Sequence, residues 1–229
     1  MKTGIDVSAW QGQINWEQTR CNGAAFAIIK TSQQLFSDQC FKQNWQGAKD
    51  ADLPRGAYHY LTWDVSPVPQ ARFFASMIKT DLPEIYPVVD FEEANGCPAN
   101  AAGLLKDFIQ EVEQRLGKAC MVYTSPGFWR SHGSSDPFFS ERPLWIANWR
   151  VTQPIIPLPW EDFTFWQFTD KGDGLSYGVS SKSVDCSYAN ITISLEQFQG
   201  MPEPQSEKMQ IDPAGQLARL WAAHPQLHV

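Results

Sequence analysis

The chain has 229 residues, of which 18 are basic and 25 are acidic, so its net charge at pH 7 is −7. This length suits one sizeable domain, and an acidic balance without any run of Lys or Arg argues against nucleic acid as a partner. Membrane insertion is not expected, because no stretch reaches the ~20 apolar residues that a membrane span needs.

Apolar runs that are typical of strands alternate with helical segments over the first 124 residues. Short runs rich in β-branched residues predict buried strands, and apolar residues at helical spacing predict amphipathic helices. An amphipathic stretch around Ile14 and Trp16 follows the first strand. The expected strands are residues 4–8, 26–31, 56–62, 85–92 and 120–124, and the expected helices are residues 41–51, 69–78 and 99–116.

The pattern changes after residue 124, where further strands are expected with little helix between them, at residues 144–149, 163–169 and 184–187. Together with the first five, these make eight strands, which is the number that closes a barrel. Regular alternation of strand and helix favours a parallel sheet. The sequence therefore predicts an α/β, TIM-like barrel of the (β/α)5(β)3 type, with eight strands and about five helices.

Two acids, Asp90 and Glu92, stand at the end of the fourth expected strand. Side chains alternate along a strand, so both acids point the same way while Phe91 between them enters the core. Their Cα atoms are expected roughly 6.5–7 Å apart at about 3.3 Å rise per residue. When two carboxylates share one partly buried face, either the pKa of one of them is raised or their charge serves a function. Paired acids are typical of glycoside hydrolysis. The alternatives, solvated residues at a strand end or a cation site, stay open here.

In a TIM-like barrel the catalytic groups lie at the carboxyl ends of the strands. Several polar and aromatic residues are expected at that rim besides the acid pair: Asp6, Tyr58, Tyr60, Tyr123, Trp149, Asp170 and Asp185. His59 alternates to the opposite face from its two tyrosine neighbours, so we expect it to pack behind the strand.

Seven short segments occur in an order that resembles glycoside hydrolase family 25, the muramidase family of bacterial and phage lysozymes. They are GIDVS with WQG at 4–12, GAYHY at 56–60, DFE at 90–92, VYT at 122–124, LWIANW at 144–149, WQFT at 166–169 and VDCS at 184–187. The resemblance implies cleavage of the β-1,4 bond between N-acetylmuramic acid and N-acetylglucosamine, with cell-wall peptidoglycan as the partner. It implies no cofactor and no metal.

Four acids match the active-site set of that family: Asp6, Asp90, Glu92 and Asp185. Glu92 is expected to be the general acid, because a partly desolvated carboxyl flanked by other acids holds its proton to higher pH. Asp90 is expected to stay ionised and oppose the oxocarbenium-like charge, or to orient the 2-acetamido group of the substrate. A carboxylate nucleophile, inversion and substrate assistance all stay open, and we favour net retention with substrate assistance.

The remaining acids have two interpretations each. Asp6 and Asp185 either raise the pKa of Glu92 or bind substrate hydroxyls, or else they form hydrogen bonds that close the barrel or anchor a loop. Stacking on the sugar, or hydrogen bonds to it, is expected of four aromatic residues, for which ordinary packing is the alternative: Tyr58, Tyr60, Tyr123 and Trp149.

Other functions compete with that of a muramidase. A chitinase-like DxxDxDxE pattern ending at Glu92 would need acids where Ile85 and Val88 stand, so this rival fails. A non-catalytic barrel that binds peptidoglycan or chitin would be expected to lose the general acid first, yet Asp90 and Glu92 are both present.

The first residues and the last thirty residues of the chain bear on its localisation and its domain organisation. The start carries no apolar signal segment, so we expect synthesis in the cytoplasm as a phage-encoded or virion-associated enzyme that acts on the cell wall, with a secreted enzyme as the alternative. Residues 201–208 are polar and contain proline, and 213–223 form a short helix candidate. We therefore predict a catalytic barrel domain at 1–200 and a linker with a short C-terminal helix or tail at 201–229. The five cysteines lack CxxC spacing and are expected to be reduced, with one internal disulfide as the alternative.

Overall fold

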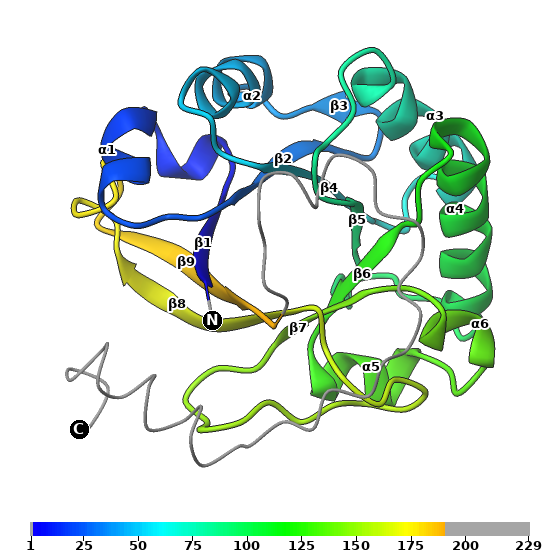
Figure 1. The fold of residues 1–229 in the computed structure, drawn as a ribbon. Helices are drawn as coiled ribbons and strands as arrows, with labels where there is room; N and C mark the ends of the chain where they lie inside the picture. Colours follow the sequence, from blue (N-terminus) through cyan, green and yellow to red (C-terminus); the bar gives the residue numbers. More distant parts are fainter. Residues whose placement is uncertain (1, 191–229) are drawn as a thin grey trace.

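The computed structural model describes residues 2–190, and within them eight strands close into a barrel (Figure 1). Around the barrel the order is β1, β2, β4, β5, β6, β7, β8 and β9, which pairs again with β1. The short β3 (Phe36–Ser37) pairs only with the end of β2. The barrel strands are β1 (Lys2–Val7), β2 (Ala27–Gln33), β4 (Arg55–Tyr60), β5 (Pro87–Asp90), β6 (Met121–Thr124), β7 (Leu144–Ala147), β8 (Phe165–Asp173) and β9 (Ser183–Ala189). The predicted TIM-like barrel is confirmed.

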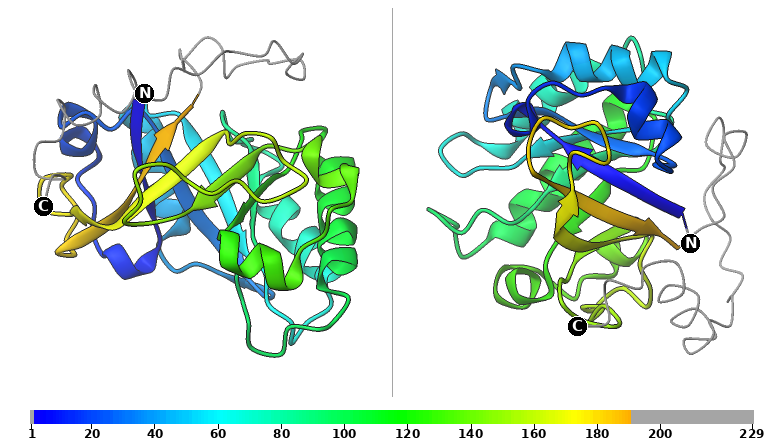
Figure 2. Two further views of the ribbon diagram at one scale, coloured as in Figure 1. Left: turned by 90° about the horizontal axis from the view of Figure 1, so that it is seen from below. Right: turned by 90° about the vertical axis from the view of Figure 1, so that its left-hand side faces the viewer.

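One strand runs against the predicted parallel order. β9 pairs antiparallel with both β8 and β1, while the other barrel pairings are parallel. Residues 174–182 connect β8 to β9, which is too short for the crossover of about a dozen residues or more that a parallel pair needs. The reversal places Asp185, near the start of β9, opposite Asp6. It also brings Lys2 beside Ala189 at the other end of the barrel (Figure 2).

The predicted helices are present with small shifts in their bounds, and two further helices were not predicted. Figure 1 shows α2, α3 and α4 on the outside of β2, β4, β5 and β6. The missed helices, α5 and α6, are seven and four residues long, too short for helical periodicity to show. Each begins with a proline after a capping Ser125 or Asp136. The helices are α1 (Trp16–Cys21), α2 (Phe41–Asp50), α3 (Pro67–Ile78), α4 (Ala101–Leu116), α5 (Pro126–His132) and α6 (Pro137–Ser140), with a 3₁₀ turn at Ala9–Gln11.

Alternation along the strands divides the apolar residues into two clusters. One cluster fills the barrel and includes Phe26, Val88 and Phe165, and the other packs the outer strand faces against the helices and includes Val89. A Cβ atom on Gly4 would lie 2.4 Å from ring carbons of Phe26, so this close approach requires glycine. Apolar side chains fill the interior of the barrel, and polar residues lie at the end where the parallel strands have their carboxyl ends.

Three further predictions concern the tail, membrane insertion and the cysteines. The predicted linker and tail at 201–229 lie outside the described residues, so the division into 1–200 and 201–229 stays a prediction. None of the helices in residues 2–190 is long and apolar enough to cross a membrane. All five cysteines lie in the described part, where they are free thiols.

Candidate active site

The predicted acids and aromatic residues meet on the inner face at the carboxyl end of the barrel strands. Strand pairing places Tyr60, Asp90 and Tyr123 in one row across β4, β5 and β6. On the opposite side Asp6 of β1 lies beside Asp185 of β9. These residues come from segments far apart in the sequence, and closure of the barrel brings them to one rim.

Gln167 on β8 joins the predicted residues, although the sequence did not identify it as part of the site. Its Nε2 group donates to Oδ2 of Asp6 at 3.0 Å and to Oδ2 of Asp185 at 3.3 Å. Its Oε1 atom accepts from the hydroxyl of Tyr123 and from Nε1 of Trp149, both at 3.0 Å. One buried carboxamide therefore fixes two acids and two aromatic residues. The sequence offered one signal for this role: Gln167 lies two positions after the interior Phe165, so strand alternation places it on the same inner face.

Glu92 lies just beyond the end of β5 and reaches the site from a loop. The loop is anchored by Phe91, whose buried ring makes edge contacts with Phe128 at 4.9 Å and Trp129 at 5.8 Å between ring centroids. Glu92 keeps an exposed face toward a cavity. Its pKa is raised, chiefly by burial among the surrounding groups and then by the negative charge of Asp185.

Asp90 is the most enclosed acid of the site, with 6% of its surface exposed. Its Oδ1 atom is buried and has no hydrogen-bond partner among the described residues. Burial, followed by repulsion from Glu92, raises the pKa of Asp90 well above its ordinary value. Burial thus favours the protonated form, whereas the sequence led us to expect an ionised carboxylate.

Asp6 and Asp185 complete a group of four acids whose charges influence one another. Burial and the charge of Asp185 raise the pKa of Asp6, while the hydrogen bond from Gln167 lowers it. Burial raises the pKa of Asp185 to about 6. Because these groups interact, they titrate as a set rather than one by one.

Lys30 supplies a positive charge to this acidic group and was not predicted. It follows Phe26 and Ile28 on the same face of β2, so strand alternation directs it into the barrel end. Its Nζ atom donates to Gln33 at 2.8 Å and lies 5.0 Å from the centroid of the Tyr60 ring. Burial lowers the pKa of Lys30, and attraction to Asp90 opposes that shift.

The four aromatic residues expected to bind substrate all lie around the acids, at different depths. Tyr58 is partly buried against the interior cluster, and its pKa is raised by burial and then by the charge of Asp6. The hydroxyl of Tyr60 donates to Oε2 of Glu93 at 3.1 Å. Tyr123 is buried, whereas Trp149 is 41% exposed at the rim. Trp149 therefore presents the most accessible ring surface of the four.

His59 lies outside the site, as expected from its position on the strand. It is buried behind β4, with Nδ1 at 2.8 Å from the hydroxyl of Ser32 and Nε2 at 3.0 Å from Oε1 of Gln70. Burial lowers its pKa to about 4, so the ring is neutral. Within residues 2–190 no cluster of His, Cys, Asp or Glu is arranged to hold a metal ion.

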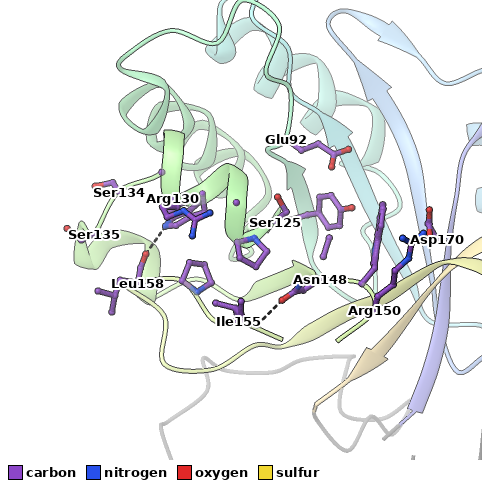
Figure 3. A pocket seen from close by; sticks show the side chains of 18 residues that line it. Glu92, Ser125, Arg130, Ser134, Ser135, Asn148, Arg150, Ile155, Leu158 and Asp170 are labelled. Atoms are coloured by element: carbon purple, nitrogen blue, oxygen red, sulfur yellow. Dashed lines mark hydrogen bonds between the residues drawn. The ribbon is translucent and has the colours of Figure 1, made fainter. Parts of the chain in front are cut away.

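A cavity of about 1060 Å³ is lined by Glu92, Tyr123 and Trp149 among others. Figure 3 shows Glu92 at one side of it. Its other walls come from α5 and from the loop that follows β7. This volume is enough for a ligand of several sugar or amino-acid units. A candidate proton donor thus stands at the edge of a large open cavity.

The family model for glycosyl hydrolases family 25 matches residues 5–176. The chain belongs to this family. As a family 25 enzyme it is a glycoside hydrolase. Lysozyme M1 of Streptomyces globisporus is 32% identical over 204 residues, which cover 82% of this chain and 69% of that protein, so the chain spans about two thirds of its length.

Two further comparisons extend over most of the family 25 domain. N,O-diacetylmuramidase of Chalaropsis sp is 28% identical over 205 residues, covering 82% of this chain and 96% of that protein. The crystal structure of the bacterial lysozyme from Streptomyces coelicolor has a TM-score of 0.73 and 29% identity, covering 82% of this chain and 92% of that one. The range matched by the family model, residues 5–176, includes Asp6, Asp90 and Glu92, and it ends before β9 and Asp185.

Proposed function

We propose that this family 25 enzyme is a peptidoglycan hydrolase that cleaves the β-1,4 bond between N-acetylmuramic acid and N-acetylglucosamine in the bacterial cell wall. The observation that carries the proposal is the position of Glu92 among four acids and at the edge of the cavity. Relatives named as a lysozyme and a muramidase support the choice of bond.

Glu92 acts as the general acid that protonates the leaving oxygen. A proton donor must hold its proton near the working pH and must reach the substrate. Glu92 meets both requirements, because its pKa is raised and its exposed face borders the cavity. The contacts of Phe91 hold the loop that carries Glu92 against α5.

Asp90 orients and polarises the 2-acetamido group, whose carbonyl oxygen attacks the anomeric carbon. Substrate assistance requires Asp90 only to accept a hydrogen bond from the acetamido N–H, and no bond forms between Asp90 and the sugar. The buried, unpartnered Oδ1 atom is available for a hydrogen bond to the substrate. Net retention of configuration follows from two displacements at the same carbon.

The other residues hold the substrate and keep the protons in place. Asp6 and Asp185 raise the pKa of neighbouring acids through their charges and accept hydrogen bonds from Gln167. Trp149 presents its exposed ring as a platform for the apolar face of a sugar. Tyr58, Tyr60 and Tyr123 bound the barrel end on which the reacting sugar rests.

The test is digestion of purified peptidoglycan by the wild-type chain, by Glu92→Gln and by Glu17→Gln, an exposed residue of α1 used as the matched control. Products are reduced with borohydride and identified by mass spectrometry. New reducing ends on muramic acid are expected with the wild type and the control, and none with Glu92→Gln.

Each alternative predicts a different result. Reducing ends on glucosamine would keep a glycosidase and overturn the choice of bond. Normal cleavage by Glu92→Gln would remove Glu92 as the acid. Failure of the wild type to cleave walls of several types, combined with retained binding to them, would favour the non-catalytic binding barrel.

A further inference from the structure

The cavity beside Glu92 has an arm that the chemistry at the barrel end does not use. This arm lies between α5, residues 133–135 and the loop after β7. Its walls are tied together, because Nε1 of Trp129 on α5 donates to the carbonyl of Leu158 at 2.6 Å. The arm is therefore a formed part of the fold, and its lining mixes apolar Ile155 and Leu158 with polar Arg130, Ser134, Ser135 and Asn148.

The charge of this arm is unusual for the molecule. Within residues 2–190, ion pairs hold five of the seven arginines: Arg20, Arg55, Arg72, Arg115 and Arg142. The other two, Arg130 and Arg150, have no ion pair in the described part of the chain, and both line the cavity. Glu92 and Asp170 line the same cavity, so its charge is mixed overall, but a guanidinium group without an ion pair can bind an anionic group of a ligand at its own end of the cavity.

The two arginines occupy different ends of the cavity. Figure 3 shows Arg150 on the side of Asp170, whereas Arg130 lies across the cavity from it, on the side of Ser134 and Ser135. Arg130 is therefore the positive charge of the arm itself.

Asn148 adds a second polar group to the arm. Its Oδ1 atom accepts from the backbone N–H of Ile155 at 3.0 Å, which fixes the side chain and leaves its Nδ2 group as a donor. A guanidinium, a carboxamide donor and apolar walls together suit a peptide that carries a carboxylate.

We propose that this arm binds the peptide that peptidoglycan carries on its muramic acid, with Arg130 paired to a peptide carboxylate. The inference rests on the proposed function, since only a peptidoglycan substrate brings such a peptide to Glu92. The peptide is attached to the sugar through the lactyl ether, so a muramic acid bound at the acids directs it into the adjoining space. The lactyl carboxyl is itself consumed in the amide bond, which makes the peptide carboxylates the nearest anions of the substrate.

The experiment compares uncrosslinked glycan strands bearing native peptides with the same strands after their carboxylates are converted to amides with carbodiimide and ammonia. The measured quantity is the ratio of kcat/KM for native over amidated strands. The wild type is expected to prefer native strands by about tenfold, the size of one charge-assisted hydrogen bond, mainly through KM. Arg130→Gln is expected to bring the ratio close to one, and Arg130→Lys to restore part of it.

Arg72→Gln is the matched control, because Arg72 lies on the outer helix α3 in an exposed ion pair with Glu111. It is expected to keep the wild-type ratio. A wild type that cleaves both kinds of strand equally well, or an Arg130→Gln variant with the wild-type ratio, would overturn the peptide site while leaving the muramidase intact. A wild type that cleaves neither kind would instead overturn the proposed function.

Discussion

The Nε2 group of Gln167 donates a hydrogen bond to Oδ2 of Asp6, which links the middle of β8 to β1 across the barrel at 3.0 Å. Gln167 is 1% exposed, and the same carboxamide accepts from Tyr123 and Trp149. A single residue thereby sets the relative positions of an acid, a tyrosine and the most exposed aromatic ring of the site.

Replacement of Gln167 is expected to reduce catalysis through positioning. Gln167→Leu removes all of these hydrogen bonds, and we expect kcat/KM to fall about 10- to 100-fold because misplaced groups lose the reacting geometry. The hydrogen bond from Gln167 lowers the pKa of Asp6, so its loss should also move the acidic limb of the pH–rate profile to higher pH. Steady-state rates from pH 3 to pH 9 measure both effects. Gln46→Leu, on the exposed face of α2, is the control, and an unchanged profile in Gln167→Leu would contradict this role.

Asp185 should make stability depend on pH in a defined direction. Its pKa is about 6 in the fold and 3.8 without the protein environment, so the cost of its charge is present above pH 6 and disappears as pH falls toward 3.8. Asp185→Asn is therefore expected to be more stable than the wild type by about 2 kcal/mol at pH 7 and equal to it near pH 4. Urea unfolding at the two pH values measures the difference. Asp50→Asn on the exposed end of α2 is the control, and a gain for Asp185→Asn that is the same at both pH values would refute the assignment.

The stereochemistry of cleavage tests the role of Asp90. Substrate assistance predicts that the first product, observed by NMR before mutarotation, retains the β configuration, and that strands without N-acetyl groups are not cleaved. Asp90→Asn should lower kcat about 100-fold or more, because the group that polarises the acetamide is lost. An α product would establish inversion, and cleavage of de-N-acetylated strands would favour a carboxylate nucleophile.

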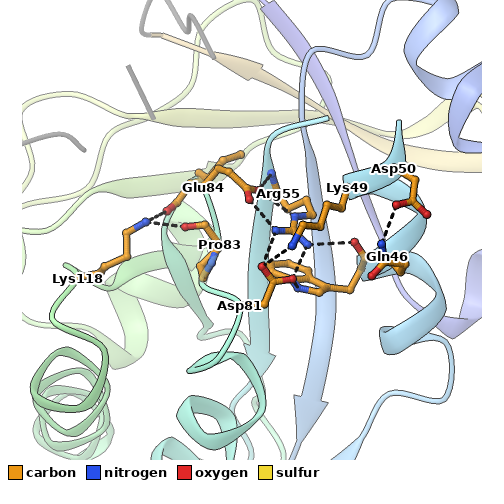
Figure 4. Close-up of polar contacts among 10 residues, drawn as sticks. Gln46, Lys49, Asp50, Arg55, Asp81, Pro83, Glu84 and Lys118 are labelled. Carbon is orange, nitrogen blue, oxygen red and sulfur yellow. Dashed lines mark hydrogen bonds and ion pairs between the residues drawn. The ribbon is translucent and has the colours of Figure 1, made fainter. Parts of the chain in front are cut away.

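Arg55 anchors the opposite end of the barrel (Figure 4). Its side chain is 1% exposed and donates to Asp81 at 3.0 Å and to Glu84 at 2.6 Å. The guanidinium carbon also lies 4.1 Å from the centroid of the Trp45 ring on α2. This network joins α2, the start of β4 and the segment that enters β5.

Arg55→Met is expected to lower the free energy of unfolding by about 3 kcal/mol, because it leaves two carboxylates without their buried partner. The specific activity of the folded protein should stay unchanged, since Arg55 lies at the amino end of β4 and the acids lie at the opposite end of the barrel. Arg20→Met, which breaks an exposed ion pair with Asp52, should cost less than about 1 kcal/mol. Denaturant unfolding of the three proteins makes the comparison, and equal losses for both variants would refute the structural role of Arg55.

Removal of residues 201–229 tests the predicted domain boundary. All eight barrel strands lie within residues 2–189, so the truncated chain is expected to fold and to cleave soluble wall fragments at the rate of the full chain. Circular dichroism and assays on the two chains give the answer. An unfolded or inactive truncated chain would show that the tail belongs to the catalytic domain.

Most features that depend on neighbouring residues in the chain were predicted from the sequence, and most features that depend on distant segments were not. The acid pair and its apolar neighbour Phe91 were found because strand alternation is a local property. α5 and α6 were missed because helices of seven and four residues leave no periodic pattern. The antiparallel direction of β9 was missed. It depends on the short connection between β8 and β9, which the pattern of residues did not show to be a hairpin.

The sequence by itself determined the α/β barrel, because alternating apolar runs follow from local chain geometry, and its resemblance to family 25 led to the prediction of the four acids. Only the tertiary structure decided how those acids are partnered. Gln167 and Lys30 enter the site because closure of the barrel places distant strands side by side. The burial that raises the pKa values of Asp90 and Glu92 depends on everything that surrounds them, and such desolvation is a property of the folded barrel rather than of any segment.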